Sequence, residues 1–161
     1  MNQENPITKS GLIKVEKELE HLIKVERESL KVVIAEAREL GDLKENAEYH
    51  AAKEKQSHVE GRIAHLQAVV ASSRVVEVGK VKSDKIVFGA TVTLYDTNKD
   101  ESVKYQIVGE EESDSKLRKI SYKSPLGKAM IGKEVGDTVL VKAPKGDLEF
   151  EVEDLEYIDN N

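Results

Sequence analysis

The first half of the chain carries hydrophobic residues at steps of three and four positions, the period of a helix that buries one narrow face. Residues 9 to 40 contain no proline and are rich in glutamate, lysine, leucine and alanine, which favour helices. One stripe consists of Leu12, Val15, Leu19, Leu22, Leu30, Val33, Ala37 and Leu40, with Glu26 in the gap. A second stripe consists of Tyr49, Ala52, Gln56, Val59, Ile63, Leu66, Val70 and Ser73. We therefore expect two long helices with coiled-coil seams.

The two stripes fit a single antiparallel hairpin. In such a hairpin the numbers of facing residues add up to a constant, and the pairs from Leu40 with Tyr49 to Leu30 with Val59 satisfy one register. The fold-back point then lies between Lys44 and Glu45, which places the tip at about residues 41–46. At a rise of about 1.5 Å per residue, each arm is a rod of roughly 45 Å.

Two polar residues interrupt the stripes, and they predict local effects on the coiled coil. Glu26 and Gln56 lower its stability and fix its register, as polar seam residues do elsewhere. The steps from Leu19 to Leu30 around Glu26 add up to eleven residues, a spacing that locally unwinds a supercoil.

From about residue 78 hydrophobic and polar residues alternate, which is typical of strands. The alternation flanks turn-forming segments at 96–100 and 144–147, which predicts two β-hairpins, and a further strand is expected near Ile120. Ser124 and Pro125 predict the start of a short helix that stops at Gly132. The predicted fold class is α+β: an N-terminal antiparallel α-helical coiled-coil hairpin (residues 1–77) and a small antiparallel β domain with one short helix (78–161).

Composition narrows the classes of function. The chain has no cysteine, no tryptophan and only seven other aromatic residues (five Tyr, two Phe), which leaves no thiol chemistry and little material for a cofactor pocket. Its net charge of -6 is unlike that of an autonomous nucleic-acid binder. No apolar run approaches the roughly 20 residues of a membrane span, and the N-terminus lacks a signal-peptide pattern. We expect a cytoplasmic protein without membrane contact.

The predicted tip carries two acids, Asp42 and Glu45. One interpretation is structural: Gly41 ends the first helix, Asp42 caps the second, and the Asp-x-x-Glu spacing resembles a capping box. The other is functional: two carboxylates at the end of a rod could supply the protein share of a Mg²⁺ shell that a partner completes. The interpretations are compatible, because a capped turn also holds the acids rigidly.

Other candidate sites carry weaker signals. Histidines occur at 21, 50, 58 and 65 without the spacing of a metal site. The acidic run from Glu110 to Glu112 is typical of a solvated loop. No glycine-rich phosphate loop or hydrolytic triad is apparent.

Two segments resemble a known family. Residues 35–54, which include Gly41-Asp42-Leu43-Lys44-Glu45-Asn46, are similar to the tip signature of the bacterial transcript cleavage factors of the GreA/GreB family. Residues 124–137 resemble the signature of the C-terminal domain of that family. The resemblance covers nearly the whole chain, and the modest charge of the hairpin is more like GreA than the more basic GreB.

This resemblance implies a transcription elongation factor that binds RNA polymerase and inserts its hairpin into the secondary channel. There it would stimulate the polymerase's own Mg²⁺-dependent cleavage of backtracked RNA and rescue arrested complexes. Asp42 and Glu45 would be the catalytic acids and would share a Mg²⁺ ion with the polymerase, whereas Arg38 and Lys53 would guide the nascent RNA 3′ end. The C-terminal half would be an FK506-binding-protein-like (FKBP-like) docking domain, with Lys128–Gly132 as the expected contact. The factor would be a monomer without independent enzymatic activity or a cofactor of its own.

Two other functions stay open. The protein could occupy the polymerase channel as a regulator without cleavage, although Asp42 and Glu45 match the pattern of the cleaving family. It could instead be a prolyl isomerase, as the expected C-terminal fold suggests. A fold does not confer a function, however, and that half has few aromatic residues for a proline cradle.

Overall fold

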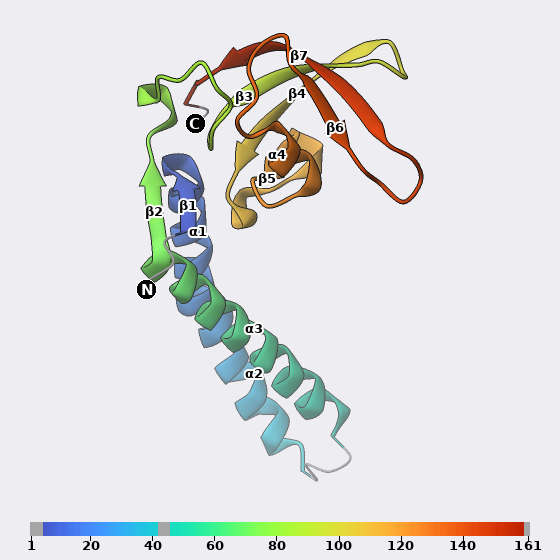
Figure 1. Cartoon of the computed structure of the whole chain (residues 1–161). Coiled ribbons are helices and arrows are strands. Elements are labelled where there is room, and N and C mark those ends of the chain that lie inside the picture. Colours follow the sequence, from blue (N-terminus) through green and yellow to red (C-terminus); the bar gives the residue numbers. More distant parts are fainter. Residues whose placement is uncertain (1–4, 42–45, 160–161) are drawn as a thin grey trace. The chain divides into compact units, whose positions relative to one another are not determined.

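The computed structural model describes residues 5–41 and 46–159 and divides the chain into two compact units (Figure 1). Ile13–Ser72 form one unit. The described residues up to Leu12 form the other, together with those from Ser73 onward. The first residues thus join the β-rich unit, whereas the boundary at residues 77 and 78 stays a prediction.

The helical unit is the antiparallel hairpin that the stripes predict. α1 (Lys9–His21), a π-helical turn η1 (Leu22–Glu26) and α2 (Arg27–Glu39) follow one another, and α3 (Ala47–Ser72) returns beside α2 (Figure 1). Leu30 of α2 packs in one buried cluster with Val59 and Ile63 of α3. The coiled-coil arrangement is therefore confirmed, and it leaves the end of α2 next to the start of α3.

The π-helical turn is the structural answer to the irregular step around Glu26. A π-turn takes in one residue more than an α-helical turn, so it accommodates the eight-residue interval between Leu22 and Leu30. The sequence predicts local unwinding at this point. It also predicts that the buried seam continues through Val33, and this is wrong, because Val33 is 42% exposed whereas Ile34 is 7% exposed. Beyond η1 the buried face of α2 runs through Leu30, Ile34 and Ala37.

Two exposed ion pairs connect the arms of the hairpin on either side of the π-turn. Arg27 donates two hydrogen bonds to the carboxylate of Glu60, at 2.9 and 2.8 Å, and Arg62 contacts Glu18 in the same manner at 2.9 and 3.1 Å. The hydrogen bond from Arg27 lowers the pKa of Glu60 below its usual value. These paired geometries add specificity to the helix pairing.

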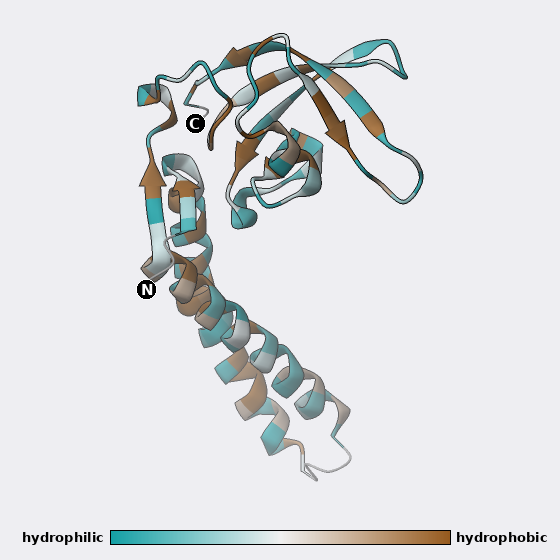
Figure 2. Cartoon of the chain, viewed as in Figure 1, coloured by the Kyte–Doolittle hydropathy of each residue, from teal (hydrophilic) through white to brown (hydrophobic). Residues whose placement is uncertain are grey.

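The β-rich unit contains a five-stranded sheet in the order β5-β4-β3-β7-β6. Its strands are β3 (Thr91–Asp96), β4 (Glu101–Val108), β5 (Lys119–Ser121), β6 (Thr138–Val141) and β7 (Leu148–Glu156). Both predicted hairpins are confirmed, and within this five-stranded sheet β5 pairs in parallel with β4, whereas the other pairs are antiparallel. Figure 2 shows hydrophobic residues along these strands, and on β3 the inward-facing Val92 and Leu94 are completely buried.

The short helix α4 (Pro125–Met130) confirms the start signal in the sequence. The hydroxyl of Ser124 caps it by accepting a hydrogen bond from the Gly127 amide at 3.1 Å. A Cβ on Gly127 would overlap the Ser121 carbonyl oxygen, so only glycine fits this close turn. Met130, on the inner side of α4, is fully buried in the core of the sheet.

The sequence does not predict two further strands, β1 (Asn5–Thr8) and β2 (Ser73–Val76), which pair in parallel. They join the segment before α1 to the segment after α3. Four residues are too few to show a clear alternation in the sequence, and their pairing spans most of the first half of the chain.

A buried carboxylate holds this N-terminal segment. Glu112 is 8% exposed, and its Oε2 accepts hydrogen bonds from the backbone amides of Thr8 at 3.1 Å and Gly109 at 2.9 Å, while the Thr8 hydroxyl donates to Oε1. The same hydroxyl accepts from the Gly11 amide at 3.0 Å and so caps α1. The expectation of a solvated loop at 110–112 is therefore wrong for Glu112, because three protein donors take the place of water as hydrogen-bond partners of its carboxylate.

Candidate functional site

The candidate site is the end of the helical hairpin, between α2 and α3. Asp42 and Glu45 lie outside the described residues, so their role stays a prediction. The described residues that bound this segment are Gly41 and Asn46, and both have defined geometry.

Gly41 ends the first arm of the hairpin as expected. The amides of Leu40 and Gly41 donate to the carbonyl oxygens of Ala37, at 3.2 Å, and Arg38, at 3.4 Å. Gly41 has a φ of 120°, a value that L residues with a side chain rarely adopt. The chain therefore leaves α2 abruptly, immediately before the acidic segment.

Asn46 begins the second arm, and this corrects the prediction that Asp42 caps it. α3 starts at Ala47, and the Oδ1 atom of Asn46 accepts a hydrogen bond from the Tyr49 amide at 3.0 Å. The Nδ2 atom of Asn46 donates to the carbonyl oxygen of Ala37 at 2.6 Å. An asparagine is favoured here because one side chain supplies the acceptor that the helix start needs and the donor that the end of α2 needs.

The N-cap of α3 is thus Asn46, four residues after the position that the spacing of the acids favours. Because Asn46 satisfies the Tyr49 amide, the capping-box interpretation of the two acids loses its basis. A sequence signal existed, since asparagine directly before a helix-favouring run is a preferred N-cap. The Asp-x-x-Glu spacing was the more conspicuous pattern and favoured the wrong position.

The predicted RNA-guiding residues flank this junction on both arms. Arg38 is exposed at the end of α2, and its guanidinium carbon lies 5.8 Å from the centroid of the Tyr49 ring. Lys53 is exposed one turn after Tyr49 and donates a hydrogen bond to Gln56 Oε1 at 3.0 Å. The structure therefore brings Arg38 close to the start of α3, where Lys53 also lies.

The described residues offer no metal site of their own. In residues 5–41 and 46–159, no three histidine, aspartate or glutamate side chains gather where a cation could bind. None of the helices in this part of the chain is long and apolar enough to cross a membrane.

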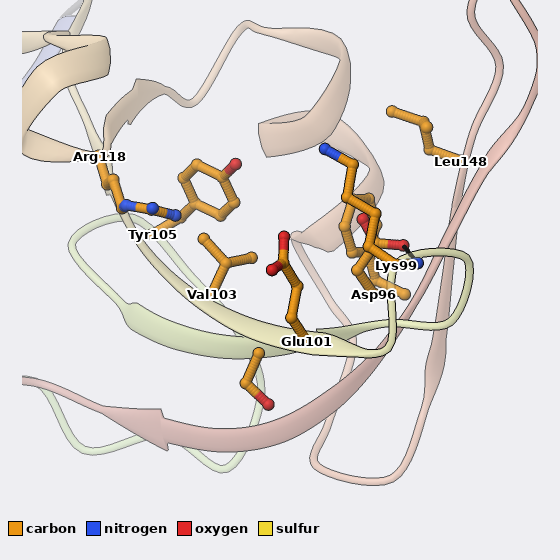
Figure 3. Close-up of a pocket in the computed structure, with 9 residues that line it drawn as sticks. Asp96, Lys99, Glu101, Val103, Tyr105, Arg118 and Leu148 are labelled. Carbon is orange, nitrogen blue, oxygen red and sulfur yellow. Dashed lines mark hydrogen bonds between the residues drawn. The ribbon is translucent and has the colours of Figure 1, made fainter.

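A separate pocket of about 340 Å³ lies in the β-rich unit (Figure 3). Tyr105 and Val103 line it together with the charged side chains of Lys99, Glu101 and Arg118. Four of its nine lining residues are charged (Asp96, Lys99, Glu101 and Arg118), which is a poor match to the mostly apolar lining of a small-ligand site. Its composition gives no support to the isomerase alternative.

Two family models match the chain. "Transcription elongation factor, N-terminal" covers residues 5–75, and "Transcription elongation factor, GreA/GreB, C-term" covers residues 81–157. A protein of Rickettsia conorii (strain ATCC VR-613 / Malish 7) named transcription elongation factor GreA is 52% identical over 157 residues, which are 98% of this chain and 97% of that protein. Its namesake of Anaeromyxobacter sp. (strain K) is 50% identical over 157 residues, 98% and 95% of the two chains.

The chain therefore belongs to the GreA/GreB family of transcription elongation factors. A crystal structure of the GreA factor homolog 1 (Gfh1) protein of Thermus thermophilus is 28% identical and covers 95% of this chain and 99% of its own, with a TM-score of 0.45. The family assignment rests on the sequence matches.

Proposed function

We propose that this protein binds RNA polymerase, inserts its helical hairpin into the secondary channel and stimulates the polymerase's cleavage of backtracked RNA. Membership of a family of transcription elongation factors supports the partner class. One observation carries the proposal beyond the family role. The four residues between the described ends of the two arms include Asp42 and Glu45, and the N-cap position of the helix that follows is occupied by Asn46 and not by Asp42.

The donor chemistry of the tip fits Mg²⁺. Carboxylate oxygens are hard ligands, and Mg²⁺ is usually held by one or two carboxylates, with water and substrate phosphates completing its shell. Asp42 and Glu45 would provide these oxygens, and the polymerase would provide the remaining ones. In a two-metal site, the bound ion stabilises the attacking or leaving oxygen of the phosphodiester.

In this proposal, other residues of the chain hold the acidic segment in place, guide the RNA and dock the protein on the polymerase. Gly41 and Asn46 fix the two ends of the acidic segment, and Arg38 and Lys53 attract the RNA backbone. The β-rich unit docks on the channel rim through the segment Lys128–Gly132, which is the end of α4 and the two residues after it, where Ile131 is 40% exposed. The protein has no catalytic cycle of its own, acts as a monomer in the cytoplasm, and its β-rich unit is FKBP-like.

RNA release from a purified, arrested polymerase complex tests the proposal. We expect the wild-type protein to shorten the RNA, and Asp42→Asn and Glu45→Gln to lose at least tenfold in rate while the melting temperature and polymerase binding stay unchanged. Wild-type protein that inhibits synthesis without shortening RNA would instead support the channel-occupying regulator. Normal cleavage by both variants would refute the role of the acids.

A further inference from the structure

An aromatic ring, Tyr49, lies beside a basic side chain close to the tip, and a second basic residue follows it on the same helix. Tyr49 is in the first turn of α3, and the guanidinium of Arg38 at the end of α2 lies 5.8 Å from the centroid of its ring. Lys53 follows Tyr49 by four residues, and residues four apart share a helix face. We call Arg38, Tyr49 and Lys53 the ring-cation surface.

Among the described residues, the buried seam next to Tyr49 is made of small side chains. The expected seam partner of Tyr49, Leu40, is 70% exposed, and the buried seam nearest the tip consists of Ala37 and Ala52. Two polar groups contact the ring: the guanidinium of Arg38, and the imidazole of His50, which meets it edge-on with 5.6 Å between ring centroids. A half-buried ring in such surroundings presents aromatic surface to a ligand as well as to the protein.

Single-stranded RNA matches this surface chemically. Proteins that hold single strands combine aromatic side chains, on which bases stack, with basic side chains that follow the phosphates. A guanidinium also binds phosphate through a planar set of donors, and it stacks on aromatic rings by the same delocalised charge. Arg38 is exposed, so it can leave the ring face to an arriving base and contact the neighbouring phosphate.

We propose that Tyr49 stacks on a nucleobase of the extruded RNA while Arg38 and Lys53 contact the phosphates on either side of that base. This inference rests on the proposed function, which brings the RNA to the tip. To the attraction between the basic side chains and the RNA phosphates it adds a contact with Tyr49 that requires a nucleobase. Tyr49 thereby acts as a positioning residue that holds the RNA strand in register with the tip.

Paired changes in the protein and in the RNA test the inference. Tyr49→Leu removes the ring and keeps a shorter apolar side chain, and Tyr49→Phe keeps the ring. An abasic nucleotide, which has phosphate and sugar but no base, is placed in turn at each extruded position. The stimulated cleavage rate is measured at a subsaturating concentration of the factor. Val32→Ala, at a position that is 57% exposed on α2, is the matched control.

On intact RNA, we expect Tyr49→Leu to reduce stimulated cleavage by roughly fivefold to 100-fold, the range that stacking on one aromatic side chain contributes. Tyr49→Phe and Val32→Ala stay within about twofold of wild type. At one abasic position the cleavage rate with wild-type protein falls by the same fold as it does with Tyr49→Leu on intact RNA. At that position the rates with wild type and with Tyr49→Leu differ by less than about twofold.

Other results overturn the inference. The inference is wrong if Tyr49→Leu stimulates cleavage of intact RNA as fast as wild type does. It is also wrong if the deficit of Tyr49→Leu is the same at every abasic position, because a purely structural role for the ring predicts that result. Wild-type protein that fails to stimulate cleavage of intact RNA refutes the proposed function itself. The two failures are therefore distinguishable.

Discussion

The side-chain amide of Asn46 donates a hydrogen bond of 2.6 Å to the carbonyl oxygen of Ala37 on the opposite arm of the hairpin. The oxygen of the same amide caps α3. One residue thus closes the base of the acidic turn. Its two bonds are chemically different, so substitutions can separate them.

Asn46→Ala removes both bonds, and we expect it to lower the free energy of unfolding of the hairpin by about 1 to 3 kcal/mol and to reduce RNA cleavage. Asn46→Asp keeps the acceptor for the Tyr49 amide but has no donor for Ala37. Its stability should therefore lie closer to wild type, whereas its cleavage should fall as in Asn46→Ala. Chemical denaturation and RNA release measure the two effects. Full cleavage by Asn46→Asp would show that the bond to Ala37 does not matter for activity.

Ile34 and Val33 are adjacent in the sequence and differ sharply in exposure, at 7% and 42%. We expect Ile34→Ala to destabilise the hairpin by about 2 to 4 kcal/mol through the cavity it leaves, and Val33→Ala by less than about 1 kcal/mol. Thermal and urea denaturation of the two variants measure the difference. Equal losses would contradict the seam that follows the π-turn.

The sequence predicts the hairpin well up to Glu26 and incompletely beyond it. Strict steps of three and four locate both helices, and the eleven-residue step from Leu19 to Leu30 identifies where regularity fails. It does not say whether the helix absorbs the irregularity by unwinding gradually or by a single π-turn. The π-turn makes Ile34 the buried residue, and this choice depends on packing against α3.

Glu112 and Gly11 form a second pair that can be tested. A Cβ on Gly11 would overlap the Glu112 carboxylate, which binds the Thr8 amide and hydroxyl. We expect Gly11→Ala and Glu112→Gln each to cost about 1 to 3 kcal/mol, and the double variant to cost less than their sum because both disrupt one set of hydrogen bonds.

Glu110→Gln is the control for this pair. Glu110 is exposed and its carboxylate forms a 3.4 Å ion pair with Lys123, so the loss of that charge should cost less than about 1 kcal/mol. Denaturation of the four variants measures the coupling. Strict additivity of Gly11→Ala and Glu112→Gln would show that the two residues act independently.

The ion pair between Glu60 and Arg27 predicts a pH dependence of the hairpin. The hydrogen bond from Arg27 lowers the pKa of Glu60 in the folded protein. Its contribution is therefore present above the unfolded pKa, about 4.3, and is lost as the pH falls through the folded value. We expect Glu60→Gln to melt at a lower temperature than wild type at pH 7 and the difference to vanish in acid. A difference that is independent of pH would contradict the pairing.

The candidate site illustrates what a single sequence can and cannot give. Its position follows from the constant register of the two stripes, and its chemistry follows from Asp42 and Glu45 together with the family signature. The cap that Asn46 provides for the Tyr49 amide is local and had a signal in the sequence. The hydrogen bond from Asn46 to Ala37 does not follow, because it forms only once the arms are paired in space. Glu112 was missed for the same reason, since its partner Thr8 lies far away in the sequence.

The Mg²⁺ dependence of RNA cleavage in an arrested polymerase complex tests the central claim most directly. The rate is measured over a range of Mg²⁺ concentrations without the factor, with wild-type protein, and with Asp42→Asn or Glu45→Gln. If the acids help to hold the ion, wild-type protein lowers the Mg²⁺ concentration for half-maximal cleavage, and either variant returns it toward the value of polymerase alone. An unchanged Mg²⁺ dependence with wild-type protein would contradict the account.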